Sequence, residues 1–385
     1  MNFRIIGGRV LHQGALQNTS IHVSAEDGSI AEIGTDRSSD TTIDASGLLV
    51  LPGIVDIHGD AFERQMMPRP GVEVALDIAL IDSDRQLVAN GITTVFHGVT
   101  WSWEPGLRGT ENARGILAAI EALRPRLAAD TRFHLRHETF NLEAEAEIAE
   151  WLVTRRIHAL AFNDHMPPAD SAAKRPDKIA QMAQRSGLSH EDFLALVQRL
   201  RSRDNEVPHS IARLAELAIA NGIPLLSHDD ASPEQRQWFR AMGCRVSEFP
   251  MNAETAQAAA AEGDSIVMGA PNVMRGKSHI GWASATEMIK RGLCSVLASD
   301  YYYPAQLIAA FRLADIDVAP IEKAWPLVSE APARAVGLND RGRIERGLRA
   351  DLVLVDPSVP ARPRVVAAVV AGRMVHLTEA DRLAH

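Results

Sequence analysis

The stretch LPGIVDIHGD, residues 51–60, decides the fold of this chain. Its apolar residues make a short run of the buried-strand type, and the Pro-Gly pair marks where that run begins. His58 and Asp60 end it. Because residues two apart on an extended chain point to the same side, we expect an imidazole and a carboxylate to converge at the end of this strand.

Seven further runs of strand type follow, and helical segments separate them. We expect the eight strands at residues 54–60, 92–98, 132–138, 158–164, 223–229, 245–250, 265–270 and 294–300. We expect helices at residues 82–90, 112–123, 144–154, 207–221, 253–262 and 284–291. This alternation predicts a parallel sheet covered by helices, and eight such strands close a (β/α)8 TIM-type barrel. A doubly wound open sheet is the alternative, but no Gly-x-Gly-x-x-Gly loop follows the first strand.

Both ends of the chain have a different sequence pattern, in which short β-prone runs alternate with turn residues. We therefore expect residues 1–50 and 339–385 to form one small composite β-sandwich domain, and residues 51–338 to form the barrel. Residues 165–207 are a polar insertion directly after a strand end, with helical patterning over 191–201. A lid over an active site and a solvated surface excursion both remain open for it.

Composition limits the class of partner. Of the 385 residues, 46% are hydrophobic and 23% charged, and the net charge is −9, so we do not expect nucleic acid. We expect Cys244 and Cys294 to be small buried residues, as in a reducing compartment. The N-terminal residues lack the apolar region of a signal peptide, and no apolar run is long enough to span a bilayer. We therefore expect a cytoplasmic protein without a membrane partner, and homo-oligomerisation remains open.

Imidazoles and carboxylates collect at the ends of the expected strands. These residues are His58, Asp60, Glu138, His165, His228, Asp229, Asp230 and Asp300. The carboxyl ends of barrel strands converge on one face, where imidazole and carboxylate ligands suit Zn²⁺, Mn²⁺ or Fe²⁺. Each residue alone also has a structural explanation, and for Asp230 we favour a helix cap. The combination favours a metal site, in which Glu138 bridges two ions and Asp300 moves a proton.

A second set of residues concerns the substrate. Arg64 and Arg69 follow the first strand, and Arg275, Lys277 and His279 follow the seventh. Arginine and lysine beside glycine-rich backbone favour phosphate oxygens, although a solvated loop with scattered charge is the alternative. Two further substrate contacts are expected at the ends of the second and last strands, from His97 and Tyr301, and for His97 a packing role remains open.

Motifs along nearly the whole chain resemble one branch of the amidohydrolase superfamily. The first strand carries His-x-Asp where that superfamily usually has His-x-His, as in the diphosphatases of phosphonate metabolism in the carbon–phosphorus lyase pathway. Further matching motifs are MPRP at 67–70, NGITTV at 90–95, LRHE at 135–138, NDH at 163–165, SHDDA at 227–231, EFP at 248–250, GAPNVMRG at 269–276, SDYYYP at 299–304 and RADLV at 349–353.

This resemblance implies a binuclear metal barrel that hydrolyses α-D-ribose 1-methylphosphonate 5-triphosphate to the 5-phosphate and pyrophosphate. It implies metal ligands at His58, Asp60, Glu138, His165, His228 and Asp300, with Asp300 also as proton shuttle. It further implies two divalent ions, zinc or alternatively manganese or iron. An amide or cyclic-imide hydrolase on the same metal centre is the rival interpretation, and a non-catalytic scaffold is a third.

Two features depart from the family pattern. Gly59 stands between the first two ligands where some relatives carry a larger residue, and we expect it to open the floor of the pocket. Trp101 and Trp103, after the second strand, are expected to be exposed and to affect the choice of substrate.

Overall fold

The computed structural model describes residues 2–35, 38, 39, 41–69, 71–168, 176–276 and 284–384. The chain divides into two compact units. The first unit comprises Met1–His97, Leu123–Arg132 and Ser265–His385, and the second comprises Gly98–Ala122 and Phe133–Asp264. Each unit is described by itself below.

Eight parallel strands confirm the expected (β/α)8 class. They are β8 (Ile54–Gly59), β9 (Ile92–Trp101), β10 (Asp130–Glu138), β11 (Ala159–Asn163), β12 (Leu225–His228), β13 (Val246–Glu248), β14 (Ser265–Gly269) and β15 (Val296–Ala298). They follow one another in the sheet in sequence order. Within the first unit, a parallel bridge joins Gly59 at the end of β8 to Asp300 just after β15, so the last strand returns to the first.

The six expected helices are present. They are α2 (Leu76–Ala89), α3 (Thr110–Leu123), α4 (Glu145–Val153), α8 (Val207–Ala220), α10 (Ala253–Ala261) and α12 (Ala285–Lys290). Sequence patterning missed others, namely α1 (Glu63–Met66), α9 (Pro233–Ala241), α11 (Ala270–Arg275), α13 (Ala305–Asp315), α14 (Ile321–Ala324) and α15 (Glu330–Ala335). The signal at α9 is local: Ser232 accepts a hydrogen bond from the amide of Gln235, and Pro233 occupies the first turn. Few apolar residues accompany that cap, so periodicity alone does not reveal the helix.

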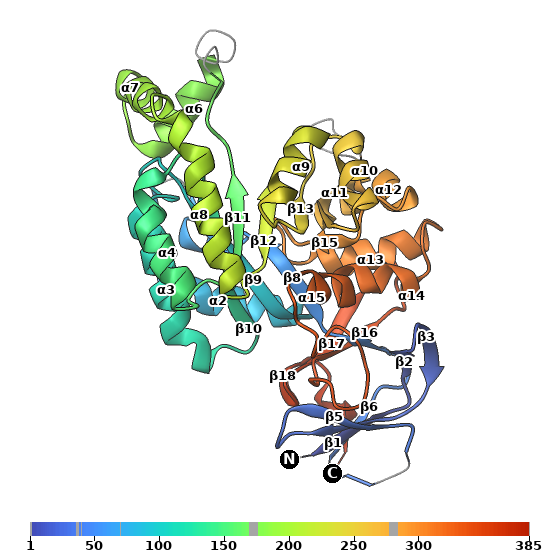
Figure 1. The fold of residues 1–385 in the computed structure, drawn as a ribbon. Coiled ribbons are helices and arrows are strands. Elements are labelled where there is room, and N and C mark those ends of the chain that lie inside the picture. Colours follow the sequence, from blue (N-terminus) through green and yellow to red (C-terminus); the bar gives the residue numbers. More distant parts are fainter. Residues whose placement is uncertain are drawn as a thin grey trace. The chain divides into compact units, whose positions relative to one another are not determined.

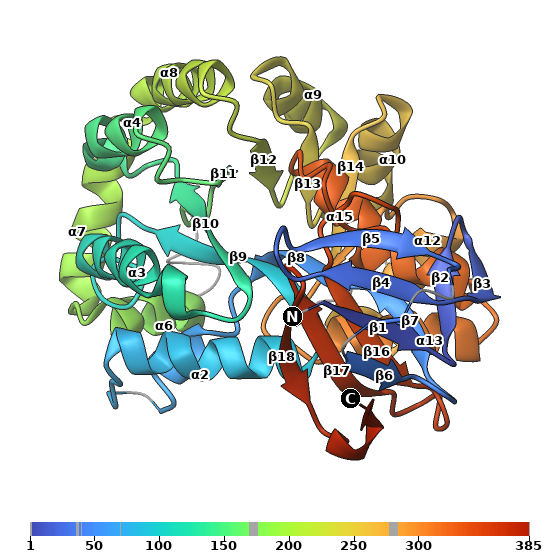
Figure 2. The ribbon, with the colours of Figure 1, turned by 90° about the horizontal axis from the view of Figure 1, so that it is seen from below.

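Strands from both ends of the chain share two sheets in the first unit, which confirms the composite β-sandwich (Figures 1 and 2). The strands are β1 (Phe3–Ile6), β2 (Arg9–His12), β3 (Ala15–Asn18), β4 (Ile21–Ser24), β5 (Ser29–Ile33), β6 (Thr41–Asp44), β7 (Leu49–Pro52), β16 (Leu352–Asp356), β17 (Arg364–Val370), β18 (Arg373–Leu377) and β19 (Leu383–Ala384). The sheet orders are β19-β6-β1-β4-β5 and β18-β17-β16-β7-β2-β3. The boundaries 1–50 with 339–385 and 51–338 stay a prediction, since the compact units divide the chain differently.

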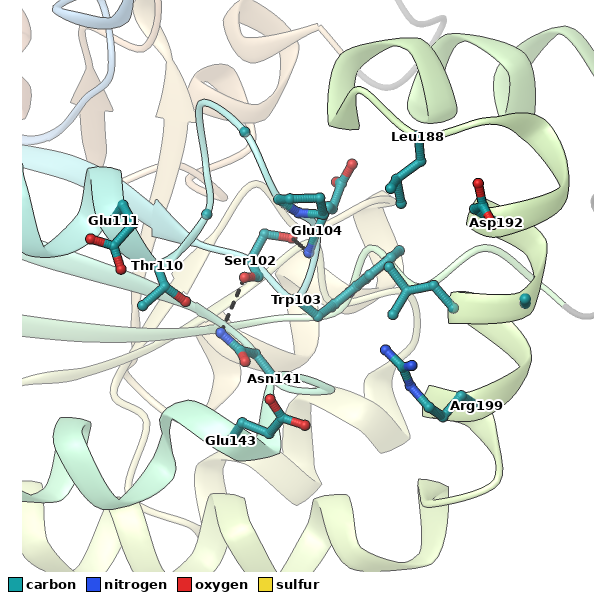
Figure 3. Close-up of a pocket in the computed structure, with 15 residues that line it drawn as sticks. Ser102, Trp103, Glu104, Thr110, Glu111, Asn141, Glu143, Leu188, Asp192 and Arg199 are labelled. Carbon is teal, nitrogen blue, oxygen red and sulfur yellow. Dashed lines mark hydrogen bonds between the residues drawn. The ribbon is translucent and has the colours of Figure 1, made fainter.

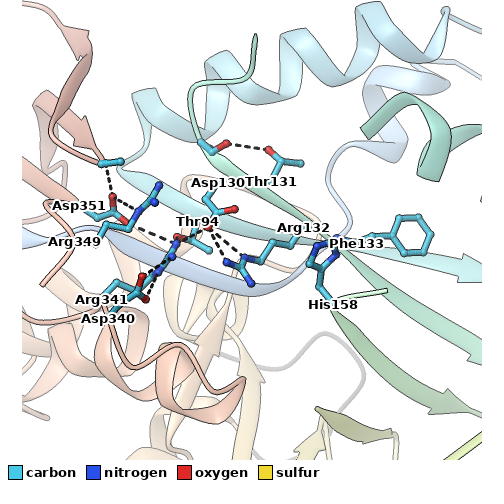
Figure 4. A network of polar contacts seen from close by, with 12 residues as sticks. Thr94, Asp130, Thr131, Arg132, Phe133, His158, Asp340, Arg341, Arg349 and Asp351 are labelled. Carbon is cyan, nitrogen blue, oxygen red and sulfur yellow. Dashed lines mark hydrogen bonds and ion pairs between the residues drawn. The ribbon is translucent and has the colours of Figure 1, made fainter. Parts of the chain in front are cut away.

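A buried arginine joins segments of the first unit that are far apart in the sequence (Figure 4). The Arg341 side chain is 4% exposed, and its Nη1 donates to Asp130 Oδ2 over 2.6 Å and to Thr94 Oγ1 over 2.9 Å. Asp351 Oδ2 lies 3.8 Å from the same Nη1. Burial alone would raise the pKa of Asp130, but Arg132 and Arg341 outweigh it and hold that pKa at about 2. The C-terminal part of the chain is thereby attached to the first residue of β10.

The insertion after β11 forms two helices of the second unit, α6 (Pro176–Ser186) and α7 (His190–Arg201). They share a small apolar core. Its buried residues are Met166, Ile179, Met182, Ala183, Phe193 and Val197, against which Trp103 and Phe140 pack. The helical patterning expected over 191–201 is thus confirmed, and part of the insertion is a packed subdomain. Among the described residues, none of the helices combines the length and apolar character that crossing a bilayer requires.

Candidate metal centre

Three of the expected metal ligands come together in the second unit. Glu138 ends β10, His228 ends β12, and His165 follows β11 by two residues. His165 Nδ1 lies 2.6 Å from Glu138 Oε1, and the His165 amide donates to Glu138 Oε2 over 3.0 Å. The rings of His165 and His228 are 5.8 Å apart.

Asp229, which the sequence analysis placed at a strand end but not among the six metal ligands, joins this group. Its Oδ2 lies 3.2 Å from His165 Nε2 and 3.1 Å from His228 Nδ1. The Asp229 backbone has φ 58°, a left-handed conformation that Asp tolerates better than most residues. That conformation turns the carboxylate between the two rings, and sequence periodicity carries no signal for it.

Asp230 does not cap the next helix, so that interpretation is wrong. The cap of α9 is Ser232. Asp230 is fully buried and accepts hydrogen bonds from Ser227 Oγ and Ser247 Oγ, and it pairs with Arg236 over 3.1 Å. It stabilises the neighbouring strands β12 and β13 and is not part of the helix start.

Electrostatics of this group suit a cation. Burial alone would lower the pKa of His165, but its hydrogen bonds to Asp229 and Glu138 raise it to about 9. The pKa of Asp229 is lowered, because the two histidines outweigh its burial. His165, His228 and Asp229 each offer a ligand atom within 4.8 Å of the others. Imidazoles and carboxylates at this spacing fit a divalent ion. Such an ion would replace the protons that now join His165 to Glu138 and Asp229.

A buried arginine contacts the ring of His228. Arg136 Nη2 lies 3.2 Å from His228 Nε2. Because a guanidinium only donates, Nε2 is the accepting nitrogen in this contact, and Nδ1 lies on the side of Asp229. Arg136 is buried and was not expected as part of the site.

The other three expected ligands come together in the first unit. The Asp300 amide donates to His58 O over 3.0 Å, and the Asp60 amide donates to Asp300 O over 3.1 Å. Asp300 has φ 56°. A Cβ at Gly269 would lie 3.1 Å from Asp300 Oδ2, so glycine at that position leaves room for the carboxylate.

Gly59 does not open the pocket floor, so that expectation is wrong. A Cβ at Gly59 would lie 2.5 Å from Asp56 Oδ2 and 3.2 Å from Ser299 Oγ. The Asp56 carboxylate fills that space and accepts from Ser299 N over 3.0 Å and from Ser299 Oγ over 2.5 Å. Burial raises the pKa of Asp56 to about 6. Because Gly59 has no side chain, the buried Asp56 carboxylate can lie beside it and bind the backbone next to Asp300.

Three of the expected substrate contacts lie together in the first unit. The Arg64 guanidinium lies over the Tyr301 ring, 5.5 Å from its centre, and Arg275 lies 5.9 Å from the same ring. Arg275 also donates to Pro271 O and to Asn272 Oδ1. Two positive charges are thus held at the residue that follows Asp300.

The remaining expected contacts are placed differently or not described. Arg69 is exposed and pairs with Val72 in a short bridge. His97 is buried against Phe62, with ring centres 4.9 Å apart, and burial lowers its pKa to about 4. Lys277 and His279 lie outside the described residues.

The tryptophan expectation is wrong for Trp101, which is 1% exposed and packs on Trp151 with ring centres 4.8 Å apart. Trp103 is half-buried against Phe193 of α7. Trp103 also lines a pocket of about 690 Å³ in the second unit, between the loop after β9 and α7 (Figure 3). None of the expected site residues lines this pocket.

Comparison with known proteins identifies relatives over most of the chain. No family model matches the sequence. The α-D-ribose 1-methylphosphonate 5-triphosphate diphosphatase of Escherichia coli K12 is 34% identical over 325 residues, which cover 81% of this chain and 84% of the relative. A dihydroorotase of Syntrophotalea carbinolica is 25% identical, with 93% and 90% covered.

Solved structures agree on the fold. Dihydropyrimidinase from Brevibacillus agri NCHU1002 superimposes with a TM-score of 0.60 at 14% identity, covering 98% of this chain and 95% of that one. The relatives are hydrolases, and members of the amidohydrolase superfamily use divalent metal ions, which the imidazole and carboxylate groups above fit. The chain therefore belongs to the α-D-ribose 1-methylphosphonate 5-triphosphate diphosphatase family, within the amidohydrolase superfamily of metal-dependent hydrolases.

Proposed function

We propose that this protein hydrolyses α-D-ribose 1-methylphosphonate 5-triphosphate to the 5-phosphate and pyrophosphate in phosphonate catabolism. The observation that carries this proposal is the pair of guanidiniums, Arg64 and Arg275, over Tyr301 beside Asp300. Guanidiniums bind phosphate oxygens in preference to neutral groups. The diphosphatase of Escherichia coli supports the same choice of substrate.

We propose as metal ligands His58, Asp60, Glu138, His165, His228 and Asp300. Asp229, which contacts both histidines, is a further candidate. We propose two divalent ions, zinc or alternatively manganese or iron. Such ions would polarise phosphoryl oxygens and lower the pKa of water.

The chain's own residues supply binding and proton transfer. Asp300 accepts the proton of the attacking water and passes it toward the departing pyrophosphate, while the bond between the first and second phosphates breaks. Arg64 and Arg275 counter the charge on the leaving phosphates, and the Tyr301 hydroxyl can donate a hydrogen bond to them. Asp56 holds Ser299 and so fixes the backbone that carries Asp300.

A cyclic-imide or amide hydrolase is the second candidate, since dihydroorotase is among the relatives. The two guanidiniums weigh against a neutral cyclic imide, which offers them no anionic partner. Dihydroorotate carries a single carboxylate, whereas a triphosphate offers several anionic oxygens to two guanidiniums. A non-catalytic scaffold is disfavoured, since all six ligand positions are filled.

The test is product analysis by ³¹P NMR, with metal-loaded protein and the ribose triphosphate phosphonate. Pyrophosphate appearing together with the 5-phosphate sugar supports the proposal. Intact substrate with metal bound would overturn it, and dihydroorotate or a hydantoin would then be the next substrate to assay.

His228→Ala should lower the metal bound per chain. The variant removes an imidazole that contacts Asp229. It also leaves the positive charge of Arg136 without its contact to His228, and that charge opposes binding of a cation. Metal content after dialysis, measured by plasma mass spectrometry, checks this. His209→Ala on the exposed face of α8 is the control and should keep the wild-type metal content. An unchanged content in His228→Ala would remove it from the ligand set.

Arg275→Ala should raise KM for the triphosphate by about 10-fold or more, because a charge-assisted hydrogen bond contributes about 1.5–3 kcal/mol. KM for a neutral amide should change much less. Steady-state kinetics on both substrates measure this difference. Arg291→Ala, an exposed arginine at the end of α12, is the matched control. Equal effects on both substrates would contradict a phosphate contact at Arg275.

A further inference from the structure

Asn163, the last residue of β11, is a buried polar side chain that the reaction above does not use. It is 0% exposed, and neither its Oδ1 nor its Nδ2 has a hydrogen-bond partner among the described residues. An unpaired buried group of this kind costs about 1–3 kcal/mol of stability. A fold that keeps it therefore gains something other than stability from it.

The strand register places Asn163 between two proposed ligands. Glu138 of β10 pairs with Asn163. On the other side, Phe162 pairs with Ser227 of β12, so the next residues along, Asn163 and His228, are neighbours. Figure 2 shows β11 between β10 and β12. Side chains in register on adjacent parallel strands point to the same face, about 4.8 Å apart.

Glu138 loses one of its two contacts with His165 if it binds a cation, while the His165 amide still donates to Glu138 Oε2. Its Oε1 now contacts His165 Nδ1 over 2.6 Å. A cation held by both residues replaces that contact, and carboxylates that bind metals are usually fixed by a hydrogen bond from an outer residue. The Asn163 carboxamide is an uncharged donor on the neighbouring strand, so it can fix the carboxylate without adding charge.

We propose that Asn163 is a positioning residue for cation binding: its Nδ2 donates to the Glu138 carboxylate when Glu138 and His165 bind a divalent ion. This inference rests on the proposed metal ligands and extends them by one residue that does not itself bind the ion.

Asn163→Leu tests the proposal, because leucine has the same branched shape as asparagine and no polar atoms. With full-length metal-free protein, the thermal midpoint should stay or rise, since an unpaired polar group is removed. Affinity for Zn²⁺, measured by competition with a chromophoric chelator, should fall about 10- to 100-fold. A residue with only a structural role would not give this combination.

Thr100→Val is the matched control. Like Asn163→Leu, it removes a buried polar group that has no partner among the described residues, here the hydroxyl of a residue in β9. It should leave the affinity for Zn²⁺ unchanged. If Asn163→Leu does not fold, Asn163→Ser and Asn163→Ala give the same comparison, since only serine keeps a donor and should bind Zn²⁺ more tightly.

Zn²⁺ affinity of Asn163→Leu within twofold of wild type would overturn the proposal, and so would a wild type that binds no Zn²⁺. The proposed reaction is tested separately. A wild type whose Zn²⁺ affinity depends on Asn163 but which leaves the triphosphate intact would overturn the reaction and not this inference.

Discussion

Asp300→Asn should lower kcat for the triphosphate by about 10²- to 10⁴-fold, the range that general acid–base catalysis contributes. An amide has the shape of the carboxylate but accepts no proton from water. The backbone bonds of Asp300 to His58 and Asp60 do not involve the side chain, so the local structure should persist. Asn also tolerates the left-handed backbone at this position, φ 56°. The measurement is turnover by ³¹P NMR, with metal content determined on the same sample.

Asp317→Asn is a close control for this variant. Asp317 has φ 57°, almost the conformation of Asp300, but it is exposed after α13. Its substitution should leave both kcat and metal content unchanged. Full activity in Asp300→Asn, with the metal retained, would exclude Asp300 as the proton shuttle. Loss of most of the metal in that variant would instead show that Asp300 acts mainly as a ligand.

The barrel was predictable because its signal is local and repeated. Each of the eight strands is a short apolar run with a turn signal, and β8 through β15 lie within a few residues of the expected ranges. The composite sheets were also predictable in outline, since both ends have the same strand-and-turn texture. The ends of strands and helices were less accurate, and α13 was missed although seven of its residues are buried.

The site was predictable in residue type but not in its contacts. Strand ends place Glu138 and His228 at the same edge of the sheet, because parallel strands end at one edge. They do not show that Asp229 contacts both histidines, since that contact depends on one left-handed backbone angle. Nor do they show that Gly59 is required by Asp56, because this close approach exists only after the chain has folded.

Trp101 shows a further limit of sequence reasoning. A tryptophan in a loop-like segment with Ser, Pro and Gly was expected to be exposed, but β9 continues to Trp101 and buries it. The ring packs on Trp151 of α4, a residue 50 positions later in the chain. Long-range contacts of this kind leave no local pattern in the sequence.

Buried ionic groups are equally hidden. Arg341 is separated from Asp130 and Thr94 by more than 200 residues. Nothing in the sequence around it distinguishes it as a buried arginine. The sequence gives residue types for such a network, while the pairing depends on how the C-terminal strands return to the barrel. The contribution of this network to the free energy of unfolding therefore has to be measured by mutation.

Arg341→Met should lower the free energy of unfolding by about 3–5 kcal/mol, the usual cost of removing one partner from a buried ion pair. Methionine keeps most of the apolar contacts of the side chain but leaves Asp130 and Asp351 without the Arg341 charge. The measurement is the thermal midpoint together with denaturant unfolding at neutral pH. Both should fall clearly below the wild-type values.

Arg343→Met provides the contrast, two residues away. Arg343 is about one-third exposed and pairs with Glu345 and Glu330 at 3.2 and 3.7 Å. A surface pair of this kind contributes about 0–1 kcal/mol, so the variant should unfold almost as the wild type does. Replacing Asp130 by Asn together with Arg341→Met should recover part of the loss, because a half-buried carboxylate that has lost one of its two arginine partners is then removed. If Arg341→Met were no less stable than Arg343→Met, the network around Arg341 would not be what attaches the C-terminal segment to β10.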